Sequence, residues 1–338
     1  MEIALYSVPR YRAFEESFCA EISRIRPDDR FYLTGTHGHP AAAMNCAVLL
    51  TVGRVTRDDL SHYPRLALIQ TLSSGYEQID CDAASAAGVW VSYAPSEQTS
   101  NADAVSEFIV MNILNLSRNL LKVVSAVTNA PPEPLPVAQG LAGKRVCVVG
   151  LGGVGRALLK RLEPFGCATV VVTRTPDKAG LDVVPRPLSD LSRVLSDADI
   201  VVLCLRADAN NRHLFNDEIF CAMKTGAIFI NVARASLVDE AALQNAIETG
   251  HLRAAALDVL GHEPVGAINP LVNFDETLIT PHRAGLTDNM LHGTIQYVDK
   301  VLSAFLSGER PTSLLNEPAI PRRPLRRSHQ ETVSLATL

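Results

Sequence analysis

Short apolar runs alternate with amphipathic stretches over the first hundred residues. Runs suited to buried strands lie at 3–7, 31–35, 47–52, 66–72 and 90–94, and helical patterns occupy 13–25, 57–63 and 82–87. Strands that alternate with helices are typical of a parallel sheet covered by helices. We therefore predict an α/β fold for this part of the chain.

A longer helical pattern follows, from residue 102 to about residue 126. Its apolar positions lie on one helical face and are Val105, Ile109, Ile113, Leu116, Leu120 and Val124. Asn101 is suited to cap the helix N-terminus. The proline-rich stretch 130–136 ends the pattern and predicts an extended linker.

A second alternating segment begins at Lys144. Strands are predicted at 145–149, 168–173, 199–205, 227–232, 254–260 and 277–281, and helices near 153–163, 188–196, 216–223 and 239–249. This pattern matches a doubly wound dinucleotide-binding sheet. A last helix is expected over 288–306, ended by Gly308 and Pro311. The Pro-, Arg- and Ser-rich residues 319–338 are predicted to be a disordered basic tail.

A glycine loop follows the strand predicted at 145–149 and opens the next helix. Its residues are Gly150, Leu151, Gly152, Gly153, Val154 and Gly155. Such glycines allow a tight turn and close approach to a pyrophosphate, and the N–H groups of the helix N-terminus attract negative charge. The motif alone could be an ordinary turn. Between a strand and a helix, it predicts a dinucleotide site.

The end of the second strand in this segment bears on the choice of cofactor. An NAD site usually has an acidic residue there to bind the ribose hydroxyls, but this chain has Thr173, Arg174 and Thr175. Hydroxyls and a guanidinium can hold a 2′-phosphate, which a carboxylate would repel. We predict that NADP(H) is preferred and that NAD(H) is possible. The alternative is that Arg174 is a solvated loop residue.

Composition and charge exclude several other classes. The 338 residues suggest about two domains, and 47% hydrophobic with 20% charged residues indicates a globular chain. A net charge of −5 argues against a dedicated nucleic-acid binder. We expect neither a signal peptide nor a membrane span. Seven scattered cysteines indicate reduced thiols in the cytoplasm. His37 and His39 have no third ligand nearby, so we predict no metal site.

Three later segments complete the pattern. They are Asn231-Val232-Ala233-Arg234, then Leu257-Asp258 with Glu263-Pro264, then Thr280-Pro281-His282 with Ala284. In order and spacing behind the glycine loop, they resemble the D-isomer-specific 2-hydroxyacid dehydrogenase family, its glyoxylate/hydroxypyruvate reductases in particular. The resemblance covers about residues 45–310. It implies a Rossmann coenzyme domain, 101–286, inserted into a flavodoxin-like substrate domain, 1–100 and 287–318. It also implies a homodimer formed through the coenzyme domain.

The resemblance gives the matching residues their expected roles. Arg234 would hold the substrate carboxylate and polarise the keto oxygen, which suits a permanently charged, forked guanidinium. His282 would donate a proton in reduction, and Glu263 would pair with the imidazole and favour its charged form. Asp258 would accept a hydrogen bond from the nicotinamide carboxamide. Further cofactor contacts are expected from Leu205, Arg206, Val232, Ala233 and Ala284. Singly, Arg234 could instead be an ion-pair partner, Glu263 a turn residue and His282 a strand end.

A substrate loop and two departures from the family pattern complete the comparison. Ser74 and Gly75 would offer backbone N–H groups to the carboxylate, and Asn101 would lie near the substrate. Ala235 stands where the family usually has glycine, and Arg206-Ala207-Asp208 stands where it tends to have Pro-Leu-Thr. Arg206 suits a second contact with a 2′-phosphate as well as it suits a solvated loop.

We therefore predict an NADPH-preferring reductase that converts small 2-keto acids, such as glyoxylate or hydroxypyruvate, to D-2-hydroxy acids. One alternative is a reductase of sugar-derived acids such as 2-ketogluconate. The other is an NAD(H)-sensing corepressor of the same fold, in which the basic tail would bind partner proteins. The sequence does not indicate which acid is the substrate.

Overall fold

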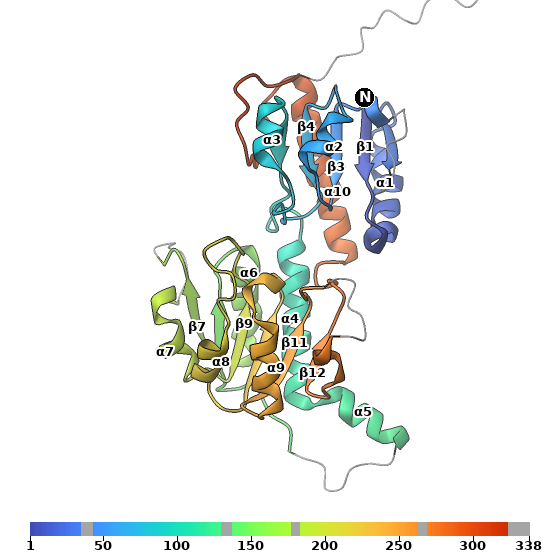
Figure 1. Ribbon diagram of the computed structural model, residues 1–338. Helices are drawn as coiled ribbons and strands as arrows, with labels where there is room; N and C mark the ends of the chain where they lie inside the picture. The colour runs from blue at the N-terminus through green and yellow to red at the C-terminus, as the bar shows by residue number, and fades with distance from the viewer. Residues whose placement is uncertain (35–42, 130–136, 177–182, 263–268, 324–338) are drawn as a thin grey trace, which may run out of the picture. The chain divides into compact units, whose positions relative to one another are not determined.

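The structure is a computed structural model that describes residues 1–34, 43–129, 137–176, 183–262 and 269–323. It divides into two compact units: unit 1 is Met1–Asn101 with Thr287–Leu338, and unit 2 is Ala102–Leu286. Each unit has its own parallel sheet, of five strands in unit 1 and seven in unit 2 (Figure 1). The predicted α/β fold is confirmed. Residues 324–338 of the predicted tail and both His37 and His39 lie outside the described residues.

The sheet of unit 1 has the order β2-β1-β3-β4-β5, which is the flavodoxin-like order. Its strands are β1 Glu2–Tyr6, β2 Arg30–Thr34, β3 Val48–Thr51, β4 Leu68–Thr71 and β5 Trp90–Ser92. Its helices are α1 Arg12–Ile25, α2 Arg57–Ser61, α3 Cys81–Ala86 and α10 Asp288–Ser307. Strands β3 and β4 are buried throughout, as expected for the centre of a sheet covered on both faces.

Alternate residues of these strands feed two apolar layers. Ile3 and Leu5 pack with α1 and α10, while Ala4 packs in a separate cluster that includes α2 and α3 residues. The last helix, α10, begins with Thr287 as its cap and ends at Gly308, whose φ of 89° suits glycine. The C-terminal segment is therefore part of the same core as the N-terminal strands.

The sheet of unit 2 has the order β12-β11-β10-β9-β6-β7-β8. Its strands are β6 Arg145–Val149, β7 Ala168–Thr173, β8 Arg186–Pro187, β9 Ile200–Leu203, β10 Ala227–Asn231, β11 Leu252–Leu257 and β12 Thr277–Ile279. Its helices are α4 Asn101–Arg118, α5 Leu120–Asn129, α6 Gly153–Leu162, α7 Leu191–Leu195, α8 Asp217–Ala222 and α9 Glu240–Glu248. The doubly wound order reverses between β6 and β9, where such sheets bind ligands. The two-residue edge strand β8 was not predicted, because an exposed Arg-Pro pair has no apolar pattern.

The single helix expected over 102–126 is wrong. Two helices, α4 and α5, meet at Asn119, which has a left-handed φ of 51° that asparagine tolerates. The Arg253 guanidinium donates to the Ser117 carbonyl and to the Asn119 side chain, so it satisfies groups at the break. Asn101 is the first residue of α4 rather than the cap before it. A one-residue shift of a helix end lies within ordinary variation.

In the described ranges, no helix is long and apolar enough to cross a membrane. The same ranges contain no group of three or more His, Cys, Asp or Glu side chains arranged to hold a metal ion.

Candidate active site

The glycine loop joins β6 to α6, and its glycines have different reasons to be there. Gly150 has a φ of 116°, and a Cβ on it would lie 2.7 Å from the backbone nitrogen of Leu205. A Cβ on Gly155 would lie 2.2 Å from the Gly150 carbonyl oxygen. Both glycines are therefore needed by the turn itself and by the packing of α6 on β6.

Gly152 is different, because no described atom lies within 4 Å of the place where its Cβ would stand. It precedes the first turn of α6, formed by Gly153, Val154 and Gly155, and supplies no side-chain cap for its N–H groups. An open glycine beside uncapped N–H groups suits the close approach of a pyrophosphate. The loop thus fits the dinucleotide expected from the sequence.

The residues expected to determine the preference between NADP(H) and NAD(H) lie at the end of β7. Thr173 is the buried last residue of that strand, and Arg174 and Thr175 are exposed. The Arg174 guanidinium forms an ion pair with the Asp208 carboxylate, which lies beyond β9. In the segment that leads from β9 to Asp208, Leu205 is buried and Arg206 is exposed. Arg174 is thus an exposed residue that also forms an ion pair across the strand ends.

Arg234 follows β10 in a turn held by a buried amide. The Asn231 side chain is 1% exposed; its Oδ1 accepts from the Ala233 N–H at 3.0 Å, and its Nδ2 donates to the Arg234 carbonyl at 3.3 Å. The half-buried Arg234 donates from Nη1 to the Ala233 carbonyl at 2.7 Å. Ala235 begins the short 3-10 turn Ala235–Leu237. It is not among the described residues with left-handed backbone, so the turn does not require glycine there.

Asp258 follows β11 and organises the next strand end. The residue is 2% exposed, and its carboxylate accepts from Thr280 Oγ1 at 2.6 Å and from the backbone N–H groups of Arg283 at 2.7 Å and Ala284 at 2.9 Å. A carboxylate has about four acceptor positions, so three are filled by the chain itself. Asp258 therefore fixes the loop that carries His282.

His282 itself has a left-handed φ of 56°. Its backbone N–H is bonded to the carbonyl oxygens of Asp258, at 2.9 Å, and Thr280, at 3.0 Å. A non-glycine residue in this region costs about 1–3 kcal/mol and persists only where its surroundings enforce it. The Asp258 contacts provide that enforcement.

Glu263 lies outside the described residues, so the structure does not place it relative to His282. Residues before and after residues 263–268 are bonded to Glu240, the first residue of α9. Its Oε1 accepts from the Gly261 N–H at 2.6 Å, and its Oε2 accepts from Asn269 Nδ2 at 3.0 Å. One carboxylate thus bonds a residue before residues 263–268 and a residue after them.

Unit 1 carries the predicted substrate residues Ser74 and Gly75 in the loop after β4. The Ser73 carbonyl next to them accepts from Thr71 Oγ1 at 2.6 Å and from the Ala94 N–H at 3.3 Å. Asn101 is half-buried at the end of the first segment of unit 1. The expected site residues are therefore divided between the two units, with Arg234, Asp258 and His282 together in unit 2.

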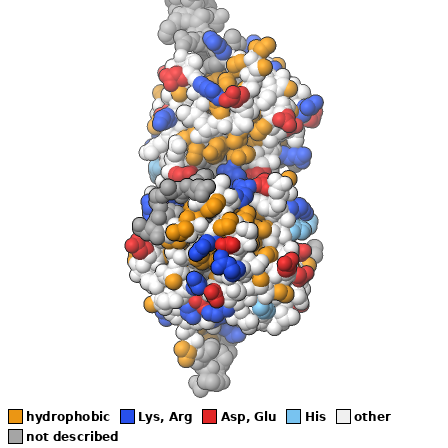
Figure 2. Space-filling model, turned by 90° about the vertical axis from the view of Figure 1, so that its left-hand side faces the viewer, with side chains coloured by type: hydrophobic (Ala, Val, Ile, Leu, Met, Phe, Trp, Pro, Cys, Tyr) orange, Lys and Arg blue, Asp and Glu red, His pale blue; other side chains and the backbone are white. Residues whose placement is uncertain are grey.

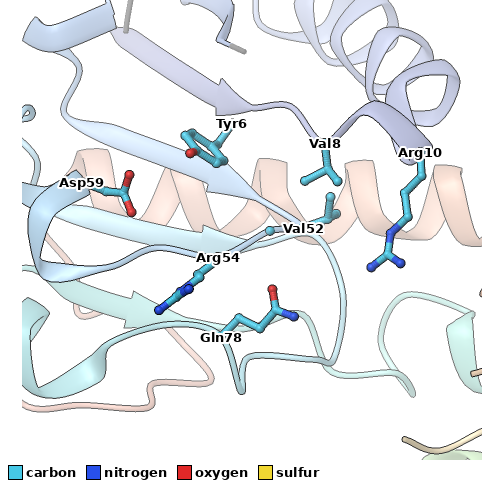
Figure 3. Close-up of a pocket in the computed structure, with 8 residues that line it drawn as sticks. Tyr6, Val8, Arg10, Val52, Arg54, Asp59 and Gln78 are labelled. Carbon is cyan, nitrogen blue, oxygen red and sulfur yellow. The ribbon is translucent and has the colours of Figure 1, made fainter. Parts of the chain in front are cut away.

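A pocket of about 280 Å³ lies in unit 1 at the carboxyl ends of β1 and β3, and Gln78 of the loop after β4 lines it (Figure 3). Polar side chains of Tyr6, Arg10, Arg54, Asp59 and Gln78 line it, with Val8, Val52 and Gly53. Burial, with the nearby Asp59 charge, raises the pKa of Tyr6, so its hydroxyl stays protonated at neutral pH. The buried Glu15 fixes one wall, because it accepts from the Ser7 hydroxyl at 2.5 Å and the Val8 N–H at 3.0 Å.

Comparison with known proteins identifies the family to which the chain belongs. The family model "D-isomer specific 2-hydroxyacid dehydrogenase, NAD binding domain" matches residues 110–284, more than half of the chain. The chain belongs to the D-isomer specific 2-hydroxyacid dehydrogenase family. It is therefore an oxidoreductase of a family that uses nicotinamide cofactors, and the prediction of an enzyme of this family is confirmed.

One relative is similar in sequence, and two solved structures are similar in fold. The glyoxylate reductase of Thermofilum pendens is 32% identical over 284 residues, which are 82% of each chain. The structure of D-2-hydroxyisocaproate dehydrogenase matches with a TM-score of 0.81 at 20% identity, over 94% of this chain and all of that one. The NADPH-dependent glyoxylate/hydroxypyruvate reductase of Sinorhizobium meliloti, solved with NADP and malonate, matches with a TM-score of 0.78 at 24% identity, over 97% and 99% of the two chains.

Within this dehydrogenase, three residues of the site escaped sequence reasoning. Asn231 was identified only as part of a motif, and Asp208 and Glu240 were given no role. Asp208 and Glu240 act through carboxylates bonded to residues distant in sequence, Arg174 and Asn269. The Asn231 amide instead bonds its near neighbours Ala233 and Arg234. Only the acidic start of α9, at Glu240, is visible beforehand, and it is explained equally well by the helix dipole.

Proposed function

We propose that this dehydrogenase reduces small 2-keto acids to D-2-hydroxy acids. The observation that carries the proposal is the position of Arg234, Asp258 and His282 at the carboxyl ends of three neighbouring strands. Asn231, Leu257 and Ile279 pair in register at those ends, so the chain leaves the sheet at one level in all three places. These residues share a sheet with an open glycine loop that suits a dinucleotide.

Each residue has a distinct part in the proposed reaction. A nicotinamide bound at the glycine loop would supply the hydride for this reduction. Arg234 binds the substrate carboxylate and polarises the carbonyl, and His282 donates a proton to the carbonyl oxygen. Asp258 holds the His282 loop and retains one acceptor position for the carboxamide. Glu263 is assigned to pair with the His282 imidazole.

Glyoxylate and hydroxypyruvate are the first substrates proposed. The support is the likeness to the Thermofilum pendens glyoxylate reductase. We further propose that NADPH is preferred over NADH, because Thr173, Arg174 and Thr175 present hydroxyls and a guanidinium where an NAD site usually has an acid.

A sugar-derived acid such as 2-ketogluconate is a second candidate, and the unit 1 pocket favours it. The pocket offers Tyr6, Arg10, Arg54 and Gln78 as donors, which suit a chain of hydroxyl groups. Gln78, which lines the pocket, belongs to the loop that also carries Ser74 and Gly75, the residues assigned to the carboxylate.

We also propose a homodimer formed through α5. This helix extends away from the sheet of unit 2 (Figure 1) and exposes Leu121, Val124 and Val127 by 60%, 58% and 84%. An apolar helix left exposed to this extent is typical of a protein interface. Replacing Leu121 and Val124 with lysine should yield a monomer in light scattering; an unchanged mass would overturn the assignment.

All seven cysteines, each in the described ranges, are free, which supports a reducing cytoplasmic setting.

The test is a panel of glyoxylate, hydroxypyruvate, pyruvate and 2-ketogluconate, each assayed with NADPH and with NADH. We expect turnover of order 1–100 s⁻¹ on at least one of the first two acids, with kcat/KM higher for NADPH. Arg174→Ala should remove that cofactor preference. Arg193→Ala, an exposed arginine of the same unit that pairs with Asp190, is the control and should not. No turnover with any acid and either cofactor would overturn the proposal.

A further inference from the structure

Arg174, which we assign to the 2′-phosphate, is already paired with the Asp208 carboxylate of this chain. Arg174 follows β7 and Asp208 follows β9, and these strands lie on either side of β6. The ion pair therefore spans the end of β6, where the glycine loop begins. It occupies the position in a doubly wound sheet where the adenosine side of a dinucleotide is expected.

The Asp208 carboxylate is held in this position by its own turn. Its Oδ1 accepts from the Asn210 N–H at 2.8 Å, while the Asp208 N–H donates to Asn211 Oδ1 at 2.8 Å. Asn211 is buried and donates through Nδ2 to the Arg206 carbonyl at 2.8 Å. These bonds leave Oδ2 for Arg174. The turn thus presents one carboxylate oxygen to the guanidinium.

The pair is close but exchangeable. The side chains of Arg174 and Asp208 are 42% and 34% exposed, and partly exposed ion pairs contribute only about 0–1 kcal/mol. A phosphate carries more negative charge and can accept two parallel bonds from a guanidinium. On the face of unit 2 that includes β7 and α7, acidic side chains lie close beside basic ones (Figure 2).

We propose that Asp208 is a specificity-determining residue that takes the place of the 2′-phosphate when the cofactor lacks one. With NADH, Asp208 neutralises Arg174, so the site accepts the smaller cofactor. With NADPH, the phosphate must displace Asp208 and lie near its charge, so Asp208 weakens NADPH binding. The inference rests on the proposed role of Arg174 and adds that the preference is limited by this chain's own carboxylate.

Binding of two cofactor fragments tests this without any catalytic assay. Calorimetry would compare 2′,5′-ADP, which carries the phosphate, with 5′-ADP, which does not. In Asp208→Asn the amide keeps the bond from Asn210 and loses the charge. We expect 2′,5′-ADP to bind about 5- to 20-fold more tightly to this variant, and 5′-ADP to change less than about twofold. Asp197→Asn is the control, because Asp197 pairs with Arg145 at the opposite end of β6.

The same change in an Arg174→Ala background shows whether Asp208 acts through the arginine. We expect the gain for 2′,5′-ADP to fall below about twofold there. An equal gain without Arg174, or no gain in the single variant, would overturn the inference. If kcat/KM of the wild-type enzyme favours NADH, only the proposed preference for NADPH is contradicted. The inference about Asp208 would survive, because Asp208→Asn can still strengthen binding of the fragment that carries the 2′-phosphate. If neither fragment binds the wild-type protein, the cofactor site itself is wrong and both proposals fall.

Discussion

The two halves of the unit 2 sheet build their strand ends in different ways. In the half formed by β6, β7 and β9 lie Arg174 and Asp208, to which we assign cofactor choice and whose side chains are 42% and 34% exposed. In the half formed by β10, β11 and β12, the turns depend on Asn231 and Asp258, which are 1% and 2% exposed. The first half uses one exchangeable ion pair, and the second uses several buried bonds to the backbone.

This difference separates what can change from what cannot. A partly solvated pair can be altered with little cost in stability, because water replaces the lost contact. A buried carboxylate cannot be removed in this way, since its donors would remain unpaired. We therefore expect substitutions in the first half to alter cofactor preference at little cost in stability, whereas the backbone around His282 is tied to folding in the second.

The largest expected effect is that of removing the proposed proton donor. His282→Ala should lower kcat for keto-acid reduction by about 10²–10⁴ without unfolding the protein. His282→Asn, which adopts the left-handed backbone readily, should lose activity to a similar extent with an unchanged melting temperature. His292→Ala, an exposed histidine in unit 1, is the control. Near-normal turnover in either His282 variant would reject the assignment.

Asp258→Asn should affect both stability and activity. The amide keeps two of the acceptor bonds but sets its NH₂ group against the Ala284 N–H. We expect a loss of about 2–4 kcal/mol in the free energy of unfolding and, because the His282 loop shifts, a fall in kcat of about 10- to 100-fold. Denaturant titration and steady-state kinetics measure the two effects. A variant with full stability would show that the bonds to the loop are unimportant.

The glycine loop offers a matched pair of substitutions. Gly155→Ala should destabilise the protein by about 1–3 kcal/mol, because the methyl meets the Gly150 carbonyl. Gly152→Ala should leave the melting temperature unchanged, since its Cβ meets no described atom, and should weaken cofactor binding. Thermal unfolding and calorimetry with NADPH separate the two outcomes. Equal effects on folding would mean that the two glycines do not have different roles.

The smallest effect concerns thiol reactivity beneath the same loop. Burial raises the pKa of Cys204 to about 12, and its Sγ lies 3.4 Å from the Gly150 carbonyl oxygen. Cys221 on α8 is exposed. At pH 8, iodoacetamide should modify Cys221 and leave Cys204 intact until the protein unfolds, as peptide mass spectrometry can measure. Rapid labelling of Cys204 would show that the loop opens in the native state.

Much of the fold could be predicted from periodicity, and the errors have physical reasons. Strands β6 and β7 were predicted at their observed bounds, because runs such as Val146–Val149 are apolar and lie between a charged residue and a glycine. The break at Asn119 was missed, since the apolar spacing continues past it while the backbone there depends on Arg253. For the site, the ordered motifs identified Arg234, Asp258 and His282, but not the partners that hold them.

The sequence by itself determined the α/β architecture, the glycine loop and the family, because these depend on residue types at short spacings along the chain. Tertiary structure alone decided that Asp208 meets Arg174, that Asp258 bonds the His282 loop and that Glu240 bonds Gly261 and Asn269. Each of these contacts joins strand or helix ends that are 21 to 34 residues apart. Parallel sheets bring such ends together at one edge, and no local pattern records which side chains will meet there.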